Sequence, residues 1–375
     1  MKKISIYLIA IFLISGMIVS CSDDFLESTP YGNMSGDLYF QTPDAGMKTV
    51  AYCYAPMWAD FPFSINKVAI GNEITDDADV GGSDPGDRPQ IPNVATGKPL
   101  TSNALLLETW SNRFDGISRC NYGIDGISQE GVILKDPNGN DVPETTKSRY
   151  ISEMKFLRAF YYFDLVTTFG SVPLLTKPSV VEDKHTVTNA TIEALREQLY
   201  QDLDACITDI NLPRAKDMPG EELGRVSKDA ALAFKARVAL FFAGMMSQGK
   251  VSGDAAAEYV LAKNAAEEVI TNGGFELIAD YQNLFRGDYF TGTQSKECIF
   301  TVLRTWIPDL YIGGDAFPIM NSGRNEVGGW GGDFKLCSRM IFLCPCFFHQ
   351  ITGCIVPTYA RLEIDFFYIH DIIPL

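Results

Sequence analysis

The stretch RAFYYFDLVTTFGSVPLL, residues 158–175, decides the fold class of this chain. From Met154 to Phe169, apolar and aromatic residues occupy two adjoining stripes of a predicted helix. A helix that is apolar over so much of its surface is buried, so we expect these rings to form a core and not an exposed ligand platform. Gly170 fits the left-handed position after the helix, and Pro173 prevents the helix from resuming.

The rest of the body is also predicted to be helical. End signals support this: Thr42 as N-cap with Pro43 at the first helical position, Ser227 and Asp254 as N-caps, and a stop at Gly273. A polar loop is expected over 71–102 and a strand within KECIFTVLR, residues 296–304. The expected helices cover 42–60, 104–127, 144–169, 189–210, 227–246 and 254–271.

The last two predicted helices carry small side chains along one face. Small residues let helices approach closely, and a short connection makes them antiparallel neighbours. Such a pair is typical of tetratricopeptide repeats, although the strict repeat signature is not legible. We therefore expect an all-α fold, a divergent tetratricopeptide-type helical repeat scaffold with a loop-rich C-terminal portion. The small-residue faces are Ala230, Ala233, Ala236, Ala239 and Ala243 on one helix, and Ala257, Leu261, Ala265 and Val269 on the other.

Residues 1–20 are predicted to be a lipoprotein signal peptide. Lys2 and Lys3 precede an apolar run that is too short for a membrane-spanning helix. Ser20 followed by Cys21 resembles the bacterial lipobox, in which the cysteine thiol carries the lipid. Acyl chains such as palmitate on Cys21 would hold the mature protein on a membrane. The alternative is an ordinary signal peptide with an incidental cysteine.

Residues 336–375 differ from everything before them. Four of the nine cysteines and two of the three histidines lie there, among apolar residues with neither helical nor strand period. We expect this Cys-rich tail to be out-of-frame or degenerate sequence and not native domain sequence. The native domain then covers residues 21–335 and is incomplete at its C-terminus. The alternative is a genuine membrane-associated tail.

Composition and spacing argue against several classes of function. The formal net charge of -16 makes the chain a poor ligand for nucleic acid. The cysteines and histidines lack zinc-site spacing, and the acidic loop lacks the terminal Glu of a calcium loop, so we expect no metal and no cofactor. The sequence contains no nucleophile elbow or phosphate loop, and we expect no enzymatic activity.

Three segments resemble the SusD/RagB family, in the expected order. RAFYYFDLVTTFGSVPLL is similar to the hallmark helix of that family, and CSDDFLESTP at 21–30 is similar to its lipidated N-terminus. GGWGGDFK at 328–335 resembles its Gly-Trp-Gly segment. Chains of the family usually continue beyond that segment into a further ordered region, so we expect this copy to lack a C-terminal part.

The resemblance implies an outward-facing outer-membrane lipoprotein of Bacteroidetes. Such proteins bind oligosaccharides and sit as a lid on a SusC-like TonB-dependent transporter. Their tetratricopeptide-type pairs form the scaffold, and their less regular loops hold the glycan. The residues SDD after Cys21 are similar to a signal for surface export in that phylum.

A glycan site needs exposed aromatic rings beside polar groups, because sugars present apolar faces and hydroxyls. Trp306 lies in a predicted loop with Tyr311 and Arg304 nearby, and is the leading candidate platform. Trp330, flanked by glycines, is either a platform or a structural landmark of the family.

Polar contacts to sugar hydroxyls are expected from Asp76, Asp77 and Arg88. Their loop resembles the region from which family members reach their ligand, and the alternative is a solvated acidic loop. Trp58 and Trp110 fall within predicted helices and are expected in the core. Two other classes of function stay open: a helical-repeat adaptor that binds protein alone, and a glycosidase, which needs two carboxylates at a defined separation.

Overall fold

The computed structural model describes most of the helical body and short parts of the C-terminal portion. The described residues are 39–59, 63, 65–72, 74–75, 78–80, 86, 89–178, 186–222, 224–277, 296–302, 334–336 and 367–368. The helices are α3 (Ala45–Tyr54), α4 (Asn66–Asn72), α5 (Gln90–Ala95), α6 (Ala104–Ser128), α7 (Glu144–Phe169), α8 (Ile192–Thr208), α9 (Lys228–Ser247) and α10 (Ala255–Asn272). Short 3-10 turns are η2 (Ala55–Trp58), η5 (Ala215–Asp217) and η6 (Gly220–Glu222).

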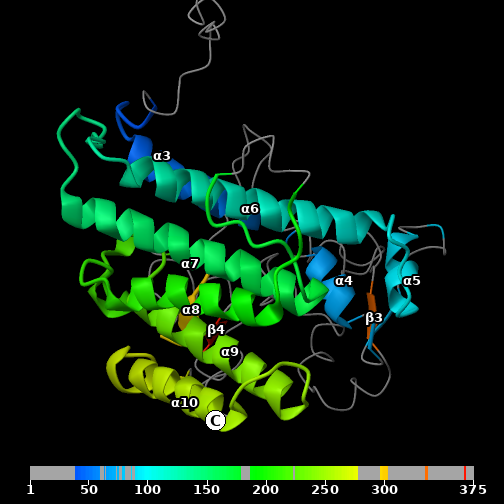
Figure 1. The fold of residues 1–375 in the computed structure, drawn as a ribbon. Helices are drawn as coiled ribbons and strands as arrows, with labels where there is room; N and C mark the ends of the chain where they lie inside the picture. Colours follow the sequence, from blue (N-terminus) through cyan, green and yellow to red (C-terminus); the bar gives the residue numbers. More distant parts are fainter. Residues whose placement is uncertain are drawn as a thin grey trace, which may run out of the picture.

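The five long helices lie side by side in chain order. Figure 1 shows α6, α7, α8, α9 and α10 as a stack, with α3 along α6 and the short helices α4 and α5 at one end. Each long helix packs chiefly against the next one in the chain, which is how helical-repeat proteins are built. The prediction of an all-α fold with a tetratricopeptide-type scaffold is confirmed.

Helix α7 lies between α6 and α8 in the stack and is buried over most of its length. Phe156, Tyr161 and Tyr162 are at most 1% exposed, so the expectation that these rings belong to the core is confirmed. Gly170 follows with φ 74° and donates its N–H to the carbonyl of Val166 at 3.0 Å. Its ψ of -122° lies outside the left-handed helical region, so the positive φ is confirmed but the left-handed cap is wrong.

An aromatic cluster joins α7 to α9. The ring of Phe234 lies 5.6 Å from Phe156, 5.3 Å from Phe160 and 5.4 Å from Phe163, measured between ring centres. Rings at these separations attract one another beyond the effect of area burial. Because three successive turns of α7 contact this one residue of α9, the cluster holds α9 against α7.

The predicted starts of the last two helices are confirmed. The hydroxyl of Ser227 accepts a hydrogen bond from the N–H of Ala230 at 3.1 Å, and the carboxylate of Asp254 accepts one from Ala256 at 2.9 Å. Both satisfy N–H groups that have no partner inside their helix. Helix α10 ends at Asn272, immediately before the predicted glycine stop.

The packing faces of α9 and α10 follow the prediction in part. The five alanines predicted on α9 are buried. On α10, Ala257 is exposed and the buried stripe is Ala262, Ala265, Ala266 and Val269. Glu258 explains the rotation: Tyr200 of α8 donates a hydrogen bond to it at 2.5 Å, which turns this side of α10 inward.

The predicted start of the first helix is wrong. Helix α3 begins at Ala45 and not at Pro43, and its N-cap residue is Asp44, with φ 63°. The N–H of Asp44 donates to the carbonyl of Lys135 at 2.8 Å, whereas Thr42 turns its hydroxyl to the carbonyl of Tyr39 at 2.7 Å. The cause is a contact with a loop some ninety residues away, which local signals do not contain.

The loop predicted over 71–102 contains regular structure. Helix α4 ends inside it, and β1 (Ala78–Val80) and α5 follow. Ile91 and Val94 of α5 are buried with Leu105 of α6 and Ala69 of α4 in a small separate core. Helices this short derive their stability from tertiary packing, so the helical pattern alone did not reveal them.

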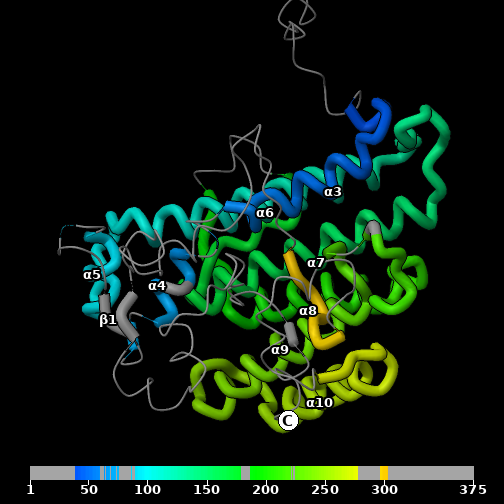
Figure 2. The backbone as a smooth tube through the Cα atoms, turned by 180° about the vertical axis from the view of Figure 1, so that it is seen from behind, coloured from blue at the N-terminus to red at the C-terminus, as the bar shows by residue number. Residues whose placement is uncertain are grey.

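Within the described residues, four short strands form two antiparallel pairs. β1 pairs with β3 (Phe334–Leu336), and β2 (Cys298–Phe300) pairs with β4 (Phe367–Tyr368). β2 confirms a strand in the segment where one was predicted. β4 belongs to the segment expected to be an aberrant tail. Figures 1 and 2 place β3 and β1 beside α5, at one end of the helical stack.

Among the described residues, α9 alone combines the length and apolar composition of a membrane-crossing helix. Most of it is buried between α7, α8 and α10, including Phe234, Val238 and Phe242. Its apolar composition is therefore explained by its central place in the stack.

Candidate functional site

The predicted site residues lie outside the described part of the chain. This holds for all the polar and aromatic candidates and for the lipidation site, and their roles stay predictions. They are Cys21, Asp76, Asp77, Arg88, Arg304, Trp306, Tyr311 and Trp330.

The described strands nevertheless connect two of the predicted segments. β1 directly follows Asp76 and Asp77 in sequence, and β3 follows the glycines after Trp330. The two strands pair antiparallel, with Ala78 opposite Leu336 and Val80 opposite Phe334. Segments more than 250 residues apart in the chain thus meet at the α5 end of the stack.

Of the two tryptophans expected in the core, Trp110 is half-buried at the edge of the core and Trp58 is exposed. Trp110 packs at 4.8 Å from Phe114 and 5.2 Å from Phe169, between ring centres. Trp58, at the end of η2, is 40% exposed. The prediction for Trp58 is wrong because α3 ends at Tyr54 and a 3-10 turn containing Pro56 follows, which buries Met57 and leaves Trp58 exposed.

A second exposed ring was missed by the sequence analysis. Tyr52 of α3 is 56% exposed, and the guanidinium carbon of Arg119 on α6 lies 3.8 Å from its ring centre. Asp115, one turn earlier on α6, holds Arg119 through an ion pair of 2.7 Å. The stacking depends on how α3 lies along α6, so no local pattern could reveal it.

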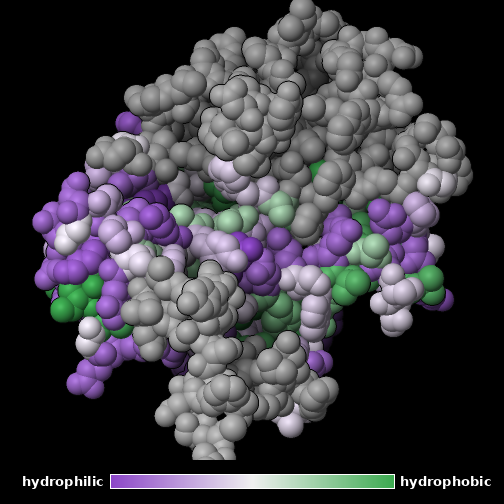
Figure 3. Space-filling view, turned by 90° about the horizontal axis from the view of Figure 1, so that it is seen from above, coloured by the Kyte–Doolittle hydropathy of each residue, from purple (hydrophilic) through white to green (hydrophobic). Residues whose placement is uncertain are grey.

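Tyr52, Trp58, Asp115 and Arg119 together are called the α3–α6 surface. Tyr52 is an exposed ring beside a guanidinium and a carboxylate, and Trp58 is a second exposed ring six residues further along the chain; exposed rings and such polar groups are what sugar faces and hydroxyls require. Figure 3 shows the molecule from above, relative to the view in Figure 1. Among the residues that it colours, hydrophilic and hydrophobic side chains are mixed on this face. The α3–α6 surface is therefore a described candidate alongside the predicted loops.

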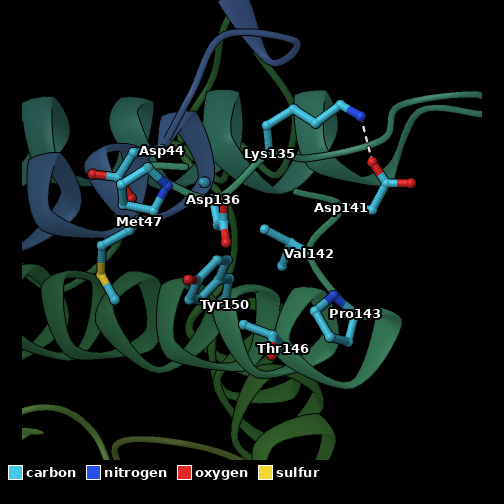
Figure 4. A pocket seen from close by; sticks show the side chains of 11 residues that line it. Asp44, Met47, Lys135, Asp136, Asp141, Val142, Pro143, Thr146 and Tyr150 are labelled. Atoms are coloured by element: carbon cyan, nitrogen blue, oxygen red, sulfur yellow. Dashed lines mark hydrogen bonds and ion pairs between the residues drawn. The ribbon is translucent and has the colours of Figure 1, made fainter. Parts of the chain in front are cut away.

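A pocket of about 230 Å³ lies where the start of α3 meets the loop before α7. Figure 4 shows Asp44, Met47 and Tyr150 on one side and the loop residues Lys135 and Asp141 on the other. Lys135 and Asp141 form an ion pair across the base of the loop.

Asp136, one of three aspartates that line this pocket, is already engaged. Asp136 accepts hydrogen bonds from the backbone N–H groups of Asn138 and Asn140, each at 2.8 Å, and from the Asn140 amide at 3.0 Å. These bonds, with Asn140 the strongest, lower the pKa of Asp136. Its carboxylate therefore builds the turn. Within the described residues, no group of three or more His, Cys, Asp or Glu side chains is arranged to hold a metal ion.

Buried carboxylates in the core are paired with cations. Asp164 of α7 lies 2.5 Å from Arg113 and 2.6 Å from Lys67. Burial raises the pKa of Asp164, but the two cations outweigh burial and hold the pKa well below its usual range. Such pairs tie helices together and do not present a carboxylate to a substrate.

The other buried charges of α7 follow the same rule. Arg158 donates to both oxygens of Asp202 on α8, at 2.8 and 2.6 Å. Glu153 is bound by Arg225 from the segment before α9. Burial raises the pKa of Glu153, although Arg225 and Arg149 oppose this effect. Each charge thus finds its partner in a different neighbour of α7.

Residues 93–240 match a SusD-like family model described as starch-binding and associating with the outer membrane. A SusD-like protein of Bacteroides ovatus is 24% identical over 295 residues, which are 78% of this chain and 48% of that protein. SusD-like protein P2 of Formosa agariphila is 26% identical over 311 residues, 80% of this chain and 53% of that protein. The chain thus spans about half the length of these curated relatives.

Solved structures share the fold. A protein titled as a laminarin binding SusD-like protein has a TM-score of 0.60 at 24% identity, covering 75% of this chain and 56% of that one. A SusD homolog from Bacteroides thetaiotaomicron has a TM-score of 0.65 at 19% identity, covering 86% and 59%. The family model, the curated relatives and the helical fold agree with the three sequence segments and support membership of the SusD-like family.

Proposed function

We propose that this chain is part of a non-enzymatic, glycan-binding lipoprotein of the outer membrane. It is anchored through Cys21, faces outward, captures an oligosaccharide and delivers it to a SusC-like TonB-dependent transporter. The observation that carries the proposal is the family match over residues 93–240, whose family is described as starch-binding and associating with the outer membrane.

Two further observations support glycan binding. The laminarin-binding title of one structural neighbour shows that this fold serves carbohydrate recognition elsewhere. The pairing of β1 with β3 joins the two segments that carry Asp76, Asp77 and Trp330. A site assembled from distant segments on a rigid helical scaffold is a common arrangement for ligand binding.

The first test is binding of the purified chain to a panel of soluble glycans that includes laminarin and starch, by affinity electrophoresis and calorimetry. Trp306→Ala should weaken binding to the best glycan by roughly tenfold or more, as expected for loss of an aromatic anchor. Tyr259→Ala is the matched control, because Tyr259 lies on α10, 42% exposed and outside every candidate segment.

Each outcome bears on the proposal. A folded chain that binds no glycan on the panel would refute glycan capture and favour a protein-binding adaptor. Binding that survives Trp306→Ala but is lost in Trp58→Ala would move the site to the α3–α6 surface. Cleavage of the bound oligosaccharide by the purified chain would refute the non-enzymatic assignment.

Delivery to a transporter needs a separate test. The chain and a SusC-like transporter would be expressed together in an outer membrane and isolated through a tag on the transporter. Isolation of the chain together with the tagged transporter supports delivery, provided that the chain is not isolated when the transporter is omitted. Failure to co-isolate, with both proteins present in the membrane, would refute it.

A further inference from the structure

The packing of α3 against α6 has a clear antiparallel register. As the chain advances along α3 and η2, the residues that it contacts on α6 have decreasing numbers. A Cβ atom placed on Gly123 would lie 2.6 Å from the methyl group of Thr49. The side chain of Arg119 donates a hydrogen bond to the backbone carbonyl of Tyr52 at 3.0 Å. The side chain of Asn112 donates one to the backbone carbonyl of Pro56 at 3.1 Å. The matched levels are Thr49 with Gly123, Tyr52 with Arg119, and Pro56 with Asn112.

Two buried cysteines fall at one level of this register. Cys53 follows Tyr52 on α3, and Cys120 follows Arg119 on α6. Both are free thiols with 0% exposure, so both face the interior and not the solvent. Tyr161 of α7 closes the same space, since its hydroxyl donates to the carbonyl of Cys53 at 2.8 Å.

The helices are also close enough for their side chains to interact directly. Gly116 and Gly123 leave α6 without side chains at two contact points, so α7 and α3 approach its backbone. Burial raises the pKa of the Cys120 thiol, and the neighbouring Cys53 thiol raises it further. The packing register thus brings the two thiols to the same level of the α3–α6 contact, and the effect of Cys53 on Cys120 is consistent with this placement.

We infer that Cys53 and Cys120 form a disulfide site, which links α3 to α6 when the chain folds in an oxidising compartment. The compartment rests on the proposed function, because a chain exported to the outer membrane passes through the bacterial periplasm, where disulfides form. The chemistry itself does not depend on export or on glycan binding.

The co-reactant is a disulfide-bearing oxidant, either a thiol–disulfide oxidoreductase or oxidised glutathione. The thiolate of one cysteine attacks the oxidant disulfide, forms a mixed disulfide and releases one oxidant sulfur as a thiol. The second cysteine loses its proton and attacks the mixed disulfide, which releases the other oxidant sulfur. The two cysteines lose two electrons and two protons in total, and the oxidant is reduced to two thiols.

Burial sets the timing of this reaction. The thiolate is the reactive form, and a buried thiol with a raised pKa supplies little of it. Oxidation therefore takes place before α3 docks on α6, and a chain that folds while reduced keeps an inert pair. Cys206 of α8 provides a control, because it is buried and donates to the backbone carbonyl of Ser152 at 3.0 Å.

The test is a peptide map of the full chain after refolding. The chain is unfolded, refolded with reduced and oxidised glutathione, alkylated, and digested with trypsin without reduction. Cleavage after lysine and arginine yields peptides 49–67 and 120–135, each with one cysteine. We expect these peptides joined, separating on reduction, with the link lost in Cys53→Ser and retained in Cys206→Ser.

Recovery of both peptides only as alkylated thiols, or joined to other cysteines, would overturn the inference. Thermal unfolding gives a second readout that does not require the variants to be equally stable. Closing a loop of about 67 residues should raise the Tm of the oxidised chain by on the order of 10 °C. The double variant Cys53→Ala/Cys120→Ala should show the same Tm in oxidising and reducing buffer. A native chain whose Tm is the same after refolding under oxidising and under reducing conditions would also overturn the inference.

Discussion

Replacing Phe234 by alanine tests whether the aromatic cluster between α7 and α9 holds the helical stack together. Phe234 is 1% exposed, and three rings of α7 lie within 5.6 Å of its ring centre. Removing the ring leaves a cavity of roughly 100 Å³, which costs about 2.4 kcal/mol. The lost burial adds about 2 kcal/mol, so the free energy of unfolding should fall by about 4 kcal/mol.

The assay is equilibrium unfolding in urea, followed by circular dichroism, for the native chain and three variants. Phe234→Leu should fall between the native chain and Phe234→Ala, and keeps the test usable if the alanine variant does not fold. Tyr259→Ala, on the exposed side of α10, should change the stability by no more than about 0.5 kcal/mol. A loss below about 1.5 kcal/mol for Phe234→Ala, with native helix content, would refute the claim that α9 is seated against α7.

Gly116→Ala should lower the free energy of unfolding by about 1–3 kcal/mol in the same urea assay, because its Cβ would lie 2.4 Å from the ring of Tyr161. Gly220→Ala is the control, because there is open space around Gly220. Equal effects of the two substitutions would contradict the close packing of α6 and α7. Asp164→Asn should cost about 3–5 kcal/mol at pH 7, because it leaves buried cations without their partner. Since the folded pKa of Asp164 is depressed below its ordinary 3.8, its stabilisation is complete above about pH 4 and is lost as pH falls further. The gap between the native chain and Asp164→Asn should therefore shrink on acidification, and a gap that is constant from pH 7 to pH 3 would exclude the ion pair as its cause. Cys21→Ala should move the exported chain from the membrane fraction to the soluble fraction, and an unchanged distribution would rule out a lipid at this residue as the anchor.

The long helices could be predicted because their signals are local. Ser227 and Asp254 mark helix starts through bonds to N–H groups two or three residues away, and the aromatic run of α7 marks a core helix by composition alone. Asp44 and α5 could not be predicted in the same way. Asp44 is held by the carbonyl of Lys135, and α5 by Ile91 and Val94 against α6, and both contacts exist only in the folded chain.

The candidate site was less accessible from the sequence. Trp58 was assigned to the core because it follows a helical pattern, but α3 changes to a 3-10 turn after Tyr54, and in that turn Met57 is buried while Trp58 is exposed. The Tyr52–Arg119 stack joins residues 67 positions apart and requires the register of two helices. The loop candidates around Trp306 and Trp330 came from the chemistry that a sugar requires, and they stay predictions.

The buried charges of α7 have a consequence for how this helix is seated. Apolar burial is non-directional, so by itself it fixes the rotation and the axial position of α7 less sharply than ion pairs do. A helix that rotated, or slid by one turn, would keep part of this burial. Such a shift would leave ionised groups in the core without counter-ions, at a cost of several kcal/mol for each. The buried ion pairs therefore select a single rotation and a single axial position of α7. The packing of the rings stabilises the helix but is less directional. The three buried charges of α7 and their partners are Glu153 with Arg225, Arg158 with Asp202, and Asp164 with Arg113.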